Sequence, residues 1–116
     1  MPEAKVEMSV RDGAPAVRII DIKGEVTAFA EPVFAEAFAR AGAGDTRAVV
    51  LNFAGMEYMN SGGIGLLVTT LIRANRNNQQ MRAYGLSQHY REILSLTRLD
   101  EAIHIFDDEA AAIAGA

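Results

Sequence analysis

Hydrophobic residues in the first quarter of the chain follow the two-residue period of β-strands. Apolar and polar residues alternate over residues 6–10, which predicts a half-buried strand. Residues 11–15, Arg-Asp-Gly-Ala-Pro, have the composition of a turn, and the apolar run over residues 16–20 predicts the returning strand of a hairpin. Residues 21–26 either prolong this strand or form a short one after a bend near Gly24.

A helix and a buried strand are expected after the hairpin. Apolar residues recur at helical spacing over residues 27–42, which predicts a helix that ends at Gly42. Residues 48–53, Ala-Val-Val-Leu-Asn-Phe, form a short apolar run typical of a central strand covered on both faces, and a loop is expected around Gly55. Three aromatic residues are expected in the core or at its edge: Phe29, Phe34 and Phe38.

Residues 60–63, Asn-Ser-Gly-Gly, precede the clearest helical pattern of the chain. The apolar residues that follow have the spacing i, i+3, i+4, i+7 and i+8: Ile64, Leu67, Val68, Leu71 and Ile72. This spacing predicts a helix with one apolar face, and residues 75–78 are expected to close it.

Two further strand–helix pairs are predicted in the last third of the chain. Residues 80–84 and 103–106 each have the composition of a short strand. Ser87 is expected to cap the helix between them, and Asp107 or Asp108 to cap a final helix. Strands and helices therefore alternate after the hairpin, which favours parallel strand pairing. We expect an α/β fold with a mixed sheet of four to five strands and helices packed mainly on one face.

Composition limits the classes of function. Of the 116 residues, 50% are hydrophobic and 22% charged, and no linker or repeat divides them, so a single domain over residues 1–116 is expected. The net charge of −4 argues against direct nucleic-acid binding, and the absence of cysteine excludes disulfides. The sequence has neither the pattern of a signal peptide nor the roughly 18 apolar residues that span a bilayer, so a cytoplasmic location is expected.

Charge is distributed unevenly along the chain. Residues 1–58 and the tail from Asp100 are acidic overall, whereas residues 59–99 contain five arginines and one glutamate. This segment either forms a basic docking patch, or its arginines lie on separate elements, where they pair with nearby acids or stay solvated. The five are Arg73, Arg76, Arg82, Arg91 and Arg98.

The turn over residues 59–65 contains the most informative chemistry. Three of its residues, in four consecutive positions, are glycines. Each would cost about 1 kcal/mol inside a helix, so they indicate a tight turn or the close approach of another backbone. Ser61 is expected at the start of the helix, where free amide groups and the helix dipole favour negative charge. A phosphate on Ser61 would be tolerated there and would present about −1.5 to −2 charges to a docking partner.

Several segments together match one known pattern. Residues 60–67, Asn-Ser-Gly-Gly-Ile-Gly-Leu-Leu, resemble the Asp-Ser-Ser/Thr-Gly-Leu-Gly-x-Leu stretch of bacterial anti-sigma-factor antagonists, the founding group of STAS domains. Residues 24–26, Gly-Glu-Val, resemble the family's Gly-Glu/Asp-Leu/Ile turn, and residues 49–56 resemble its Val-Val-Leu-Asp-Leu-Ser-x-Val strand. The similarity extends over the chain from Val6 onward, with the order and spacing of the family.

The resemblance implies a regulator that acts by binding. Unphosphorylated antagonists of this kind bind a GHKL-type anti-sigma kinase and free the sigma factor. The kinase phosphorylates the serine after the Asp, and a PP2C-type phosphatase reverses this reaction; Ser61 matches that serine. The resemblance further implies that the helix from Gly62 to Ile72 and the loop before it form the docking face, with these partner-binding residues: Tyr58, Met59, Asn60, Ser61, Gly62, Gly63 and Ile64.

Three positions depart from the family pattern. Asn60 replaces the Asp before the acceptor, Gly62 replaces the second Ser/Thr, and Asn52 replaces the Asp of the strand. Asn caps a helix about as well as Asp, so the fold is expected to tolerate Asn60. Two alternatives remain open. Either Ser61 is phosphorylated, or the chain is a non-phosphorylated binding subunit of a larger assembly, such as a lipid-transport ABC complex or a signalling scaffold.

A hydrolase is the third interpretation of Ser61. Gly-x-Ser-x-Gly nucleophile elbows also place serine at a strand-to-helix turn, but Met59 occupies the first glycine position here. His89 and His104 are the candidate bases. The sequence shows neither metal-ligand spacing nor a nucleotide-binding motif. We therefore expect no enzymatic activity, no metal and no cofactor, and the sequence leaves the oligomeric state open.

Overall fold

The computed structural model describes residues 5–115, in which one five-stranded sheet is covered by helices. The strands are β1 (Val6–Ala14), β2 (Val17–Val26), β3 (Ala48–Met59), β4 (Gln80–Tyr84) and β5 (Ile103–Phe106). The helices are α1 (Glu31–Ala41), α2 (Ser61–Arg76), α3 (Gln88–Leu96) and α4 (Glu109–Ile113), with 3-10 turns η1 (Ala28–Ala30) and η2 (Leu99–Glu101). No helix within residues 5–115 is long and apolar enough to cross a membrane.

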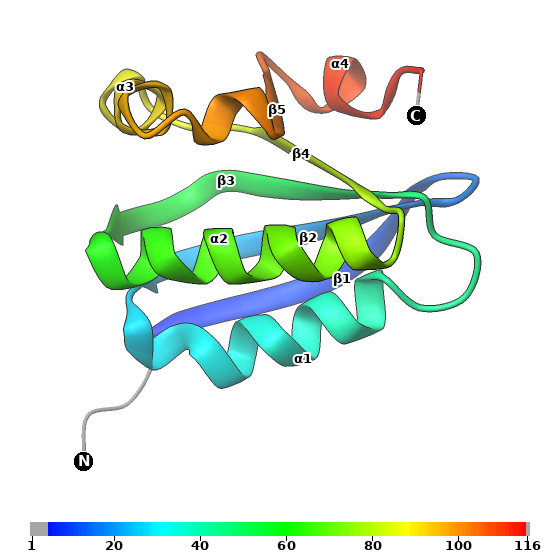
Figure 1. The fold of residues 1–116 in the computed structure, drawn as a ribbon, viewed down its shortest axis with the longest axis horizontal. Coiled ribbons are helices and arrows are strands. Elements are labelled where there is room, and N and C mark those ends of the chain that lie inside the picture. Colours follow the sequence, from blue (N-terminus) through cyan, green and yellow to red (C-terminus); the bar gives the residue numbers. More distant parts are fainter. Residues whose placement is uncertain (1–4, 116) are drawn as a thin grey trace.

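The strands lie in the order β1-β2-β3-β4-β5 across the sheet (Figure 1). The hairpin strands β1 and β2 are antiparallel, whereas the pairs β2–β3, β3–β4 and β4–β5 are parallel. Helical crossovers explain the parallel pairs, because each one returns the chain to the same end of the sheet. The expected mixed sheet is confirmed, and residues 21–26 prolong the second strand of the hairpin.

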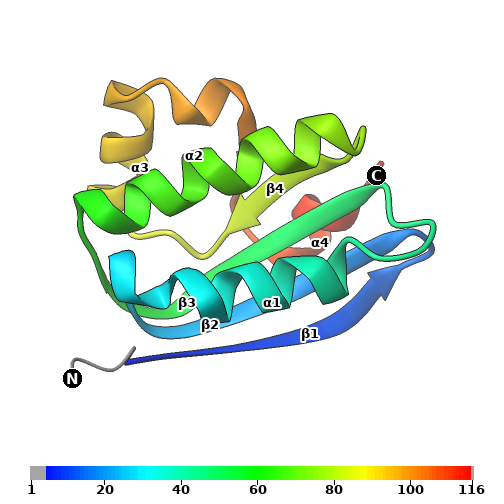
Figure 2. The same cartoon turned by 60° about the horizontal axis from the view of Figure 1, so that its bottom comes forward.

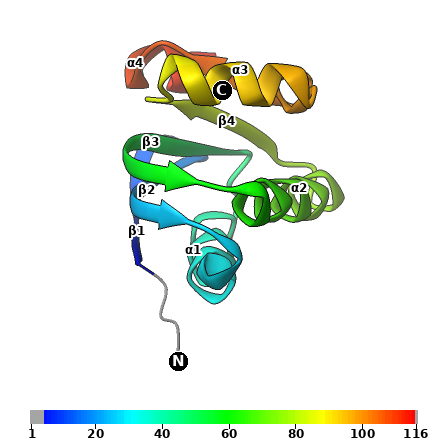
Figure 3. The ribbon, with the colours of Figure 1, turned by 90° about the vertical axis from the view of Figure 1, so that its left-hand side faces the viewer.

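Three helices cover one face of the sheet, and α4 lies against the other (Figures 2 and 3). The main core contains Phe34 and Phe38 of α1, Leu67 of α2 and Leu94 of α3, all at most 2% exposed. A smaller apolar cluster on the opposite face contains Ala112 of α4. The expectation that helices pack mainly on one face is therefore confirmed.

β3 is longer than its apolar run indicated. The predicted strand ends at Phe53, but parallel pairing with β2 continues to the pair Val26–Met59. Pairing with β4 stops earlier, at the pair Asn52–Tyr84. The last part of β3 is therefore paired with a strand on one side only. The loop expected in this region is wrong, because backbone pairing with β2 holds a segment whose side chains are mostly exposed.

The first helix begins later than predicted. Thr27 Oγ1 accepts a hydrogen bond from the backbone N–H of Phe29 (3.2 Å) and caps η1, so that α1 starts at Glu31. Phe29 is left 55% exposed on this turn, and its expected place in the core is wrong. The expected core positions of Phe34 and Phe38 are confirmed.

Candidate partner-binding site

The chain turns from β3 into α2 at Asn60, which is the N-cap of the helix. Asn60 has an extended backbone (φ −115°, ψ −172°), and its Oδ1 accepts a hydrogen bond from Gly63 N at 3.1 Å. The carbonyl oxygen of Asn60 accepts a second bond from Ile64 N at 3.0 Å. The neutral amide of Asn60 therefore satisfies the cap without the carboxylate that the family pattern has at this position.

Ser61 is the first residue of α2, and its side chain is exposed. The amide dipoles of the 16-residue helix place partial positive charge at this end, which favours a negative group on Ser61. Neither candidate base of a hydrolase forms a hydrogen bond with Ser61 in the described part of the chain. His89 packs edge-on against Tyr90 with ring centroids 4.9 Å apart, and His104 lies on β5. Ser61 is therefore accessible to solvent at the start of α2, without a hydrogen bond to either histidine.

Two of the three glycines in this turn allow close packing. A Cβ atom on Gly63 would lie 2.1 Å from the carbonyl oxygen of Val26, and one on Gly62 would lie 2.9 Å from the backbone nitrogen of Ala28. The start of α2 therefore rests directly on the end of β2 and on η1, as the glycine spacing predicted. Gly65 differs, because a Cβ atom there would meet nothing within 4 Å.

The remaining predicted partner-binding residues separate into exposed and buried groups. Tyr58 is 48% exposed, and Ile64 is partly exposed. Met59 is only 5% exposed, and Gly63 is buried, so these two residues pack on the inner side of the turn. Tyr58, Ser61 and Ile64 are thus accessible, whereas Met59 and Gly63 are buried.

Sequence reasoning missed three exposed apolar residues on η1 and α2. Phe29 lies on η1, which contacts the start of α2 through Ala28. Val68 and Ile72 are 38% and 49% exposed, although their spacing assigned them to the core face. The helical period contains the signal that could have found them, because Ser61, Val68 and Ile72 are seven and eleven residues apart and share one face.

The five arginines of the basic segment do not form one patch. Arg82 lies on β4 and donates hydrogen bonds to the carbonyl oxygens of Ala112 and Ala114. Arg91 on α3 pairs with Asp107 at 3.1 Å, and Arg98 lies 3.7 Å from Glu101. Arg73 and Arg76 are exposed in the last turn of α2. The alternative of separate, locally paired or solvated arginines is confirmed.

Comparison with known proteins assigns this architecture to a family. The STAS domain family matches residues 5–112. The chain belongs to the STAS domain family. Proteins of its antagonist branch bind and regulate other proteins and are not enzymes.

The most similar relatives include anti-sigma factor antagonists. The anti-sigma-B factor antagonist of Staphylococcus aureus is 27% identical over 86 residues, which cover 74% of this STAS domain and 80% of that protein. The anti-sigma-B factor antagonist of Staphylococcus epidermidis is 28% identical over the same length and shares of the two chains.

Solved structures show the same fold at lower sequence identity. An anti-sigma factor antagonist from Mycobacterium paratuberculosis has a TM-score of 0.79 at 19% identity, over 97% of this chain and 96% of that chain. The unphosphorylated form of the antagonist SpoIIAA has a TM-score of 0.71 at 17% identity, over 92% and 94% of the two chains. A sulfate transporter family protein from Wolinella succinogenes has a TM-score of 0.71 at 15% identity, over 90% and 87%. The predicted fold class is confirmed.

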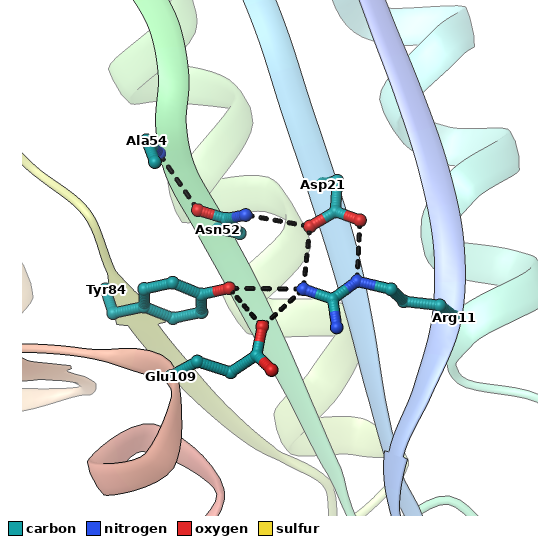
Figure 4. Close-up of polar contacts among 6 residues, drawn as sticks. All are labelled: Arg11, Asp21, Asn52, Ala54, Tyr84 and Glu109. Atoms are coloured by element: carbon teal, nitrogen blue, oxygen red, sulfur yellow. Dashed lines mark hydrogen bonds and ion pairs between the residues drawn. The ribbon is translucent and has the colours of Figure 1, made fainter.

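A polar network lies on the face of the sheet that packs against α4, opposite α1, α2 and α3 (Figure 4). Arg11 of β1 bonds to Asp21 of β2 at 2.7 Å, and also to Tyr84 of β4 and Glu109 of α4. The hydrogen bonds from Arg11 lower the pKa of the carboxyl groups of Asp21 and Glu109. Burial, together with the hydrogen bond to Glu109, raises the pKa of Tyr84 to about 12. Asn52 donates to Asp21 at 2.8 Å, so this departure from the family's strand Asp has a structural role.

Asn52→Asp is expected to destabilise the STAS domain by about 1 to 2 kcal/mol at pH 7, because it opposes two carboxylates on paired positions and removes a hydrogen bond. The neighbouring charge of Asp21 would raise the pKa of the introduced carboxyl group above its unfolded value. The loss in free energy of unfolding should therefore become smaller as the pH falls through that raised pKa. Urea unfolding of both proteins at pH 7 and pH 4 measures this. An equal deficit at the two pH values would contradict the explanation.

Proposed function

We propose that this STAS domain is an anti-sigma factor antagonist that binds its anti-sigma factor through the surface around Ser61. The observation that carries the proposal is the exposed side chain of Ser61 at the first position of α2. The names of the Staphylococcus relatives support it, since both are anti-sigma-B factor antagonists. A cytoplasmic location follows from the proposal, because sigma factors and their regulators act there.

The docking surface that we propose is mainly apolar and includes one serine. Its exposed or partly exposed residues are Phe29, Tyr58, Ser61, Ile64, Gly65, Val68 and Ile72. They come from η1, from the end of β3 and from one side of α2. A partner that covers this surface removes both the apolar side chains and the serine from water. A charge on Ser61 would then be desolvated at the interface, so phosphorylation of Ser61 would oppose binding of the partner.

The partner in this proposal is a GHKL-type serine kinase that is itself the anti-sigma factor. It phosphorylates Ser61, the phosphate releases the complex, and a PP2C-type phosphatase restores binding. SpoIIAA provides a precedent among proteins of the same fold, since it has been solved in unphosphorylated and phosphorylated forms. At the start of α2, the helix dipole favours the phosphate within the free domain.

A second candidate function follows from Asn60 and Gly62. These residues remove a carboxylate and a second hydroxyl from the neighbourhood of Ser61. The chain would then be a permanently unphosphorylated binding subunit of a larger assembly, such as a lipid-transport ABC complex or a signalling scaffold. The similar fold of a sulfate transporter family protein supports this candidate in one respect, because it is found in a protein named for transport.

Phosphorylation in vitro tests the first function against the second. The purified chain is incubated with ATP and the GHKL kinase from the same organism, and the modified residue is mapped by mass spectrometry. We expect one phosphate on Ser61 and none on the Ser61→Ala variant, which should still bind the kinase. An unmodified chain in the presence of a kinase active on another antagonist would count against the proposal. Recovery of a transporter ATPase in a pull-down would favour the second function.

A further inference from the structure

The end of β3 receives support from an element outside the sheet. Pairing with β4 stops at Asn52, and the chain then leaves the sheet at Gly85, which has a φ of +85°. A Cβ atom on Gly85 would lie 2.6 Å from Ala54 N, so the backbone passes close to β3 here, and strand pairing between β3 and β4 ends before this point. Beyond it, the backbone of β3 on that side faces α3 and has no strand beside it.

Tyr90, in the first turn of α3, supplies a hydrogen-bond acceptor on this side of β3. Its Oη accepts a hydrogen bond from the backbone N–H of Met59 at 3.0 Å. The ring is partly buried against the main core, and Ser87 caps the helix that carries it. The hydroxyl of Tyr90 therefore reaches the last residue of β3, two positions before Ser61.

The contacts that hold the start of α2 show why this bond matters. On the β2 side, Asn60 N donates to the carbonyl oxygen of Val26 at a long 3.4 Å. Within the turn, Asn60 caps Gly63 at 3.1 Å. Tyr90 contributes the shorter bond from the α3 side, to a residue that is 5% exposed. Without that oxygen, the N–H of Met59 would lose its partner in a site largely closed to water, which favours movement of the turn.

We propose that Tyr90 is a positioning residue for the phosphoacceptor. Its hydroxyl fixes the end of β3 so that Ser61 is held in the orientation that the anti-sigma kinase binds and phosphorylates. The expected effect of Tyr90 on phosphorylation rests on the proposed function. Its effect on the turn depends only on the hydrogen bonds described above. It also makes α3 part of the site, although α3 lies outside the docking surface.

Tyr90→Phe tests the inference, because it removes one oxygen atom and keeps the ring. Tyr84→Phe is the matched control, since Tyr84 donates its hydroxyl to Glu109 in the polar network on the opposite face of the sheet. Two quantities are measured for both variants and for the unchanged protein. They are amide hydrogen exchange at Met59 and Asn60, whose N–H groups are both hydrogen-bonded, and the rate of Ser61 phosphorylation by the GHKL kinase.

We expect Tyr90→Phe to accelerate exchange at these amides about tenfold and to slow phosphorylation about fivefold, the size of effect that a lost buried hydrogen bond produces. Tyr84→Phe should change neither quantity, even if it lowers the melting temperature as much as Tyr90→Phe does. Unchanged exchange in Tyr90→Phe would overturn the inference, as would an equal loss of phosphorylation in both variants. If the unchanged protein is not phosphorylated, the proposed regulation fails, and amide exchange alone then decides whether Tyr90 holds the turn.

Discussion

Gly63→Ala is expected to lower the free energy of unfolding by about 3 kcal/mol or more. The added Cβ atom would lie 2.1 Å from the carbonyl oxygen of Val26 and 2.8 Å from Cγ of Met59. The carbonyl belongs to the backbone of a buried strand end, so relief requires that α2 move away from β2. Urea or thermal unfolding measures the loss, which should correspond to roughly 10 °C in melting temperature.

Gly65→Ala provides the matched control for this prediction. It makes the same chemical change two residues further along the same helix, where a Cβ atom meets nothing within 4 Å. Removing a glycine from a helix should stabilise the protein by about 0.5 to 1 kcal/mol. Equal effects of the two substitutions would show that α2 does not rest on β2 as described.

Ser61→Glu is expected to weaken binding of the anti-sigma factor about 100-fold or more while leaving the melting temperature almost unchanged. The residue is exposed and begins α2, so the helix dipole accommodates the charge in the free protein. Docking would bury that charge among apolar side chains, which costs several kcal/mol. Isothermal titration calorimetry with the purified anti-sigma factor measures the affinity, and a thermal melt measures stability.

Two controls separate this effect from general consequences of added charge. Ser95→Glu introduces the same side chain at an exposed serine of α3, outside the proposed docking surface, and should leave the affinity nearly unchanged. Ser61→Ala should also bind, because it adds no charge. Full binding by Ser61→Glu would contradict the proposed switch, whereas loss of folding would indicate that the turn has no room for a longer side chain.

Local patterns were sufficient to predict much of the fold. The apolar run at 48–53, the helical spacing after Ile64 and the capping residues Asn60 and Ser87 each depend on neighbours in sequence. The three glycines of the turn also indicated close backbone contact, which holds for Gly62 and Gly63. These features are local, so the printed sequence contains the physical reasons for them.

Other features depend on contacts between distant parts of the chain. The extension of β3 is held by pairing with β2, and Phe29 is exposed because a short 3-10 turn precedes α1. The hydrogen bond between Tyr90 and Met59 joins residues 31 positions apart, and Arg11 meets Glu109 across 98 positions. No periodicity in the sequence reports such pairs, because they arise only when the sheet and its helices assemble.

The free space around Gly65 makes this position suitable for a fluorescent label. These 116 residues contain no cysteine, so Gly65→Cys would introduce one thiol among them. The position is exposed, has free space around it and lies one helical turn after Ser61. An environment-sensitive fluorophore attached there would report arrival and departure of a partner in real time.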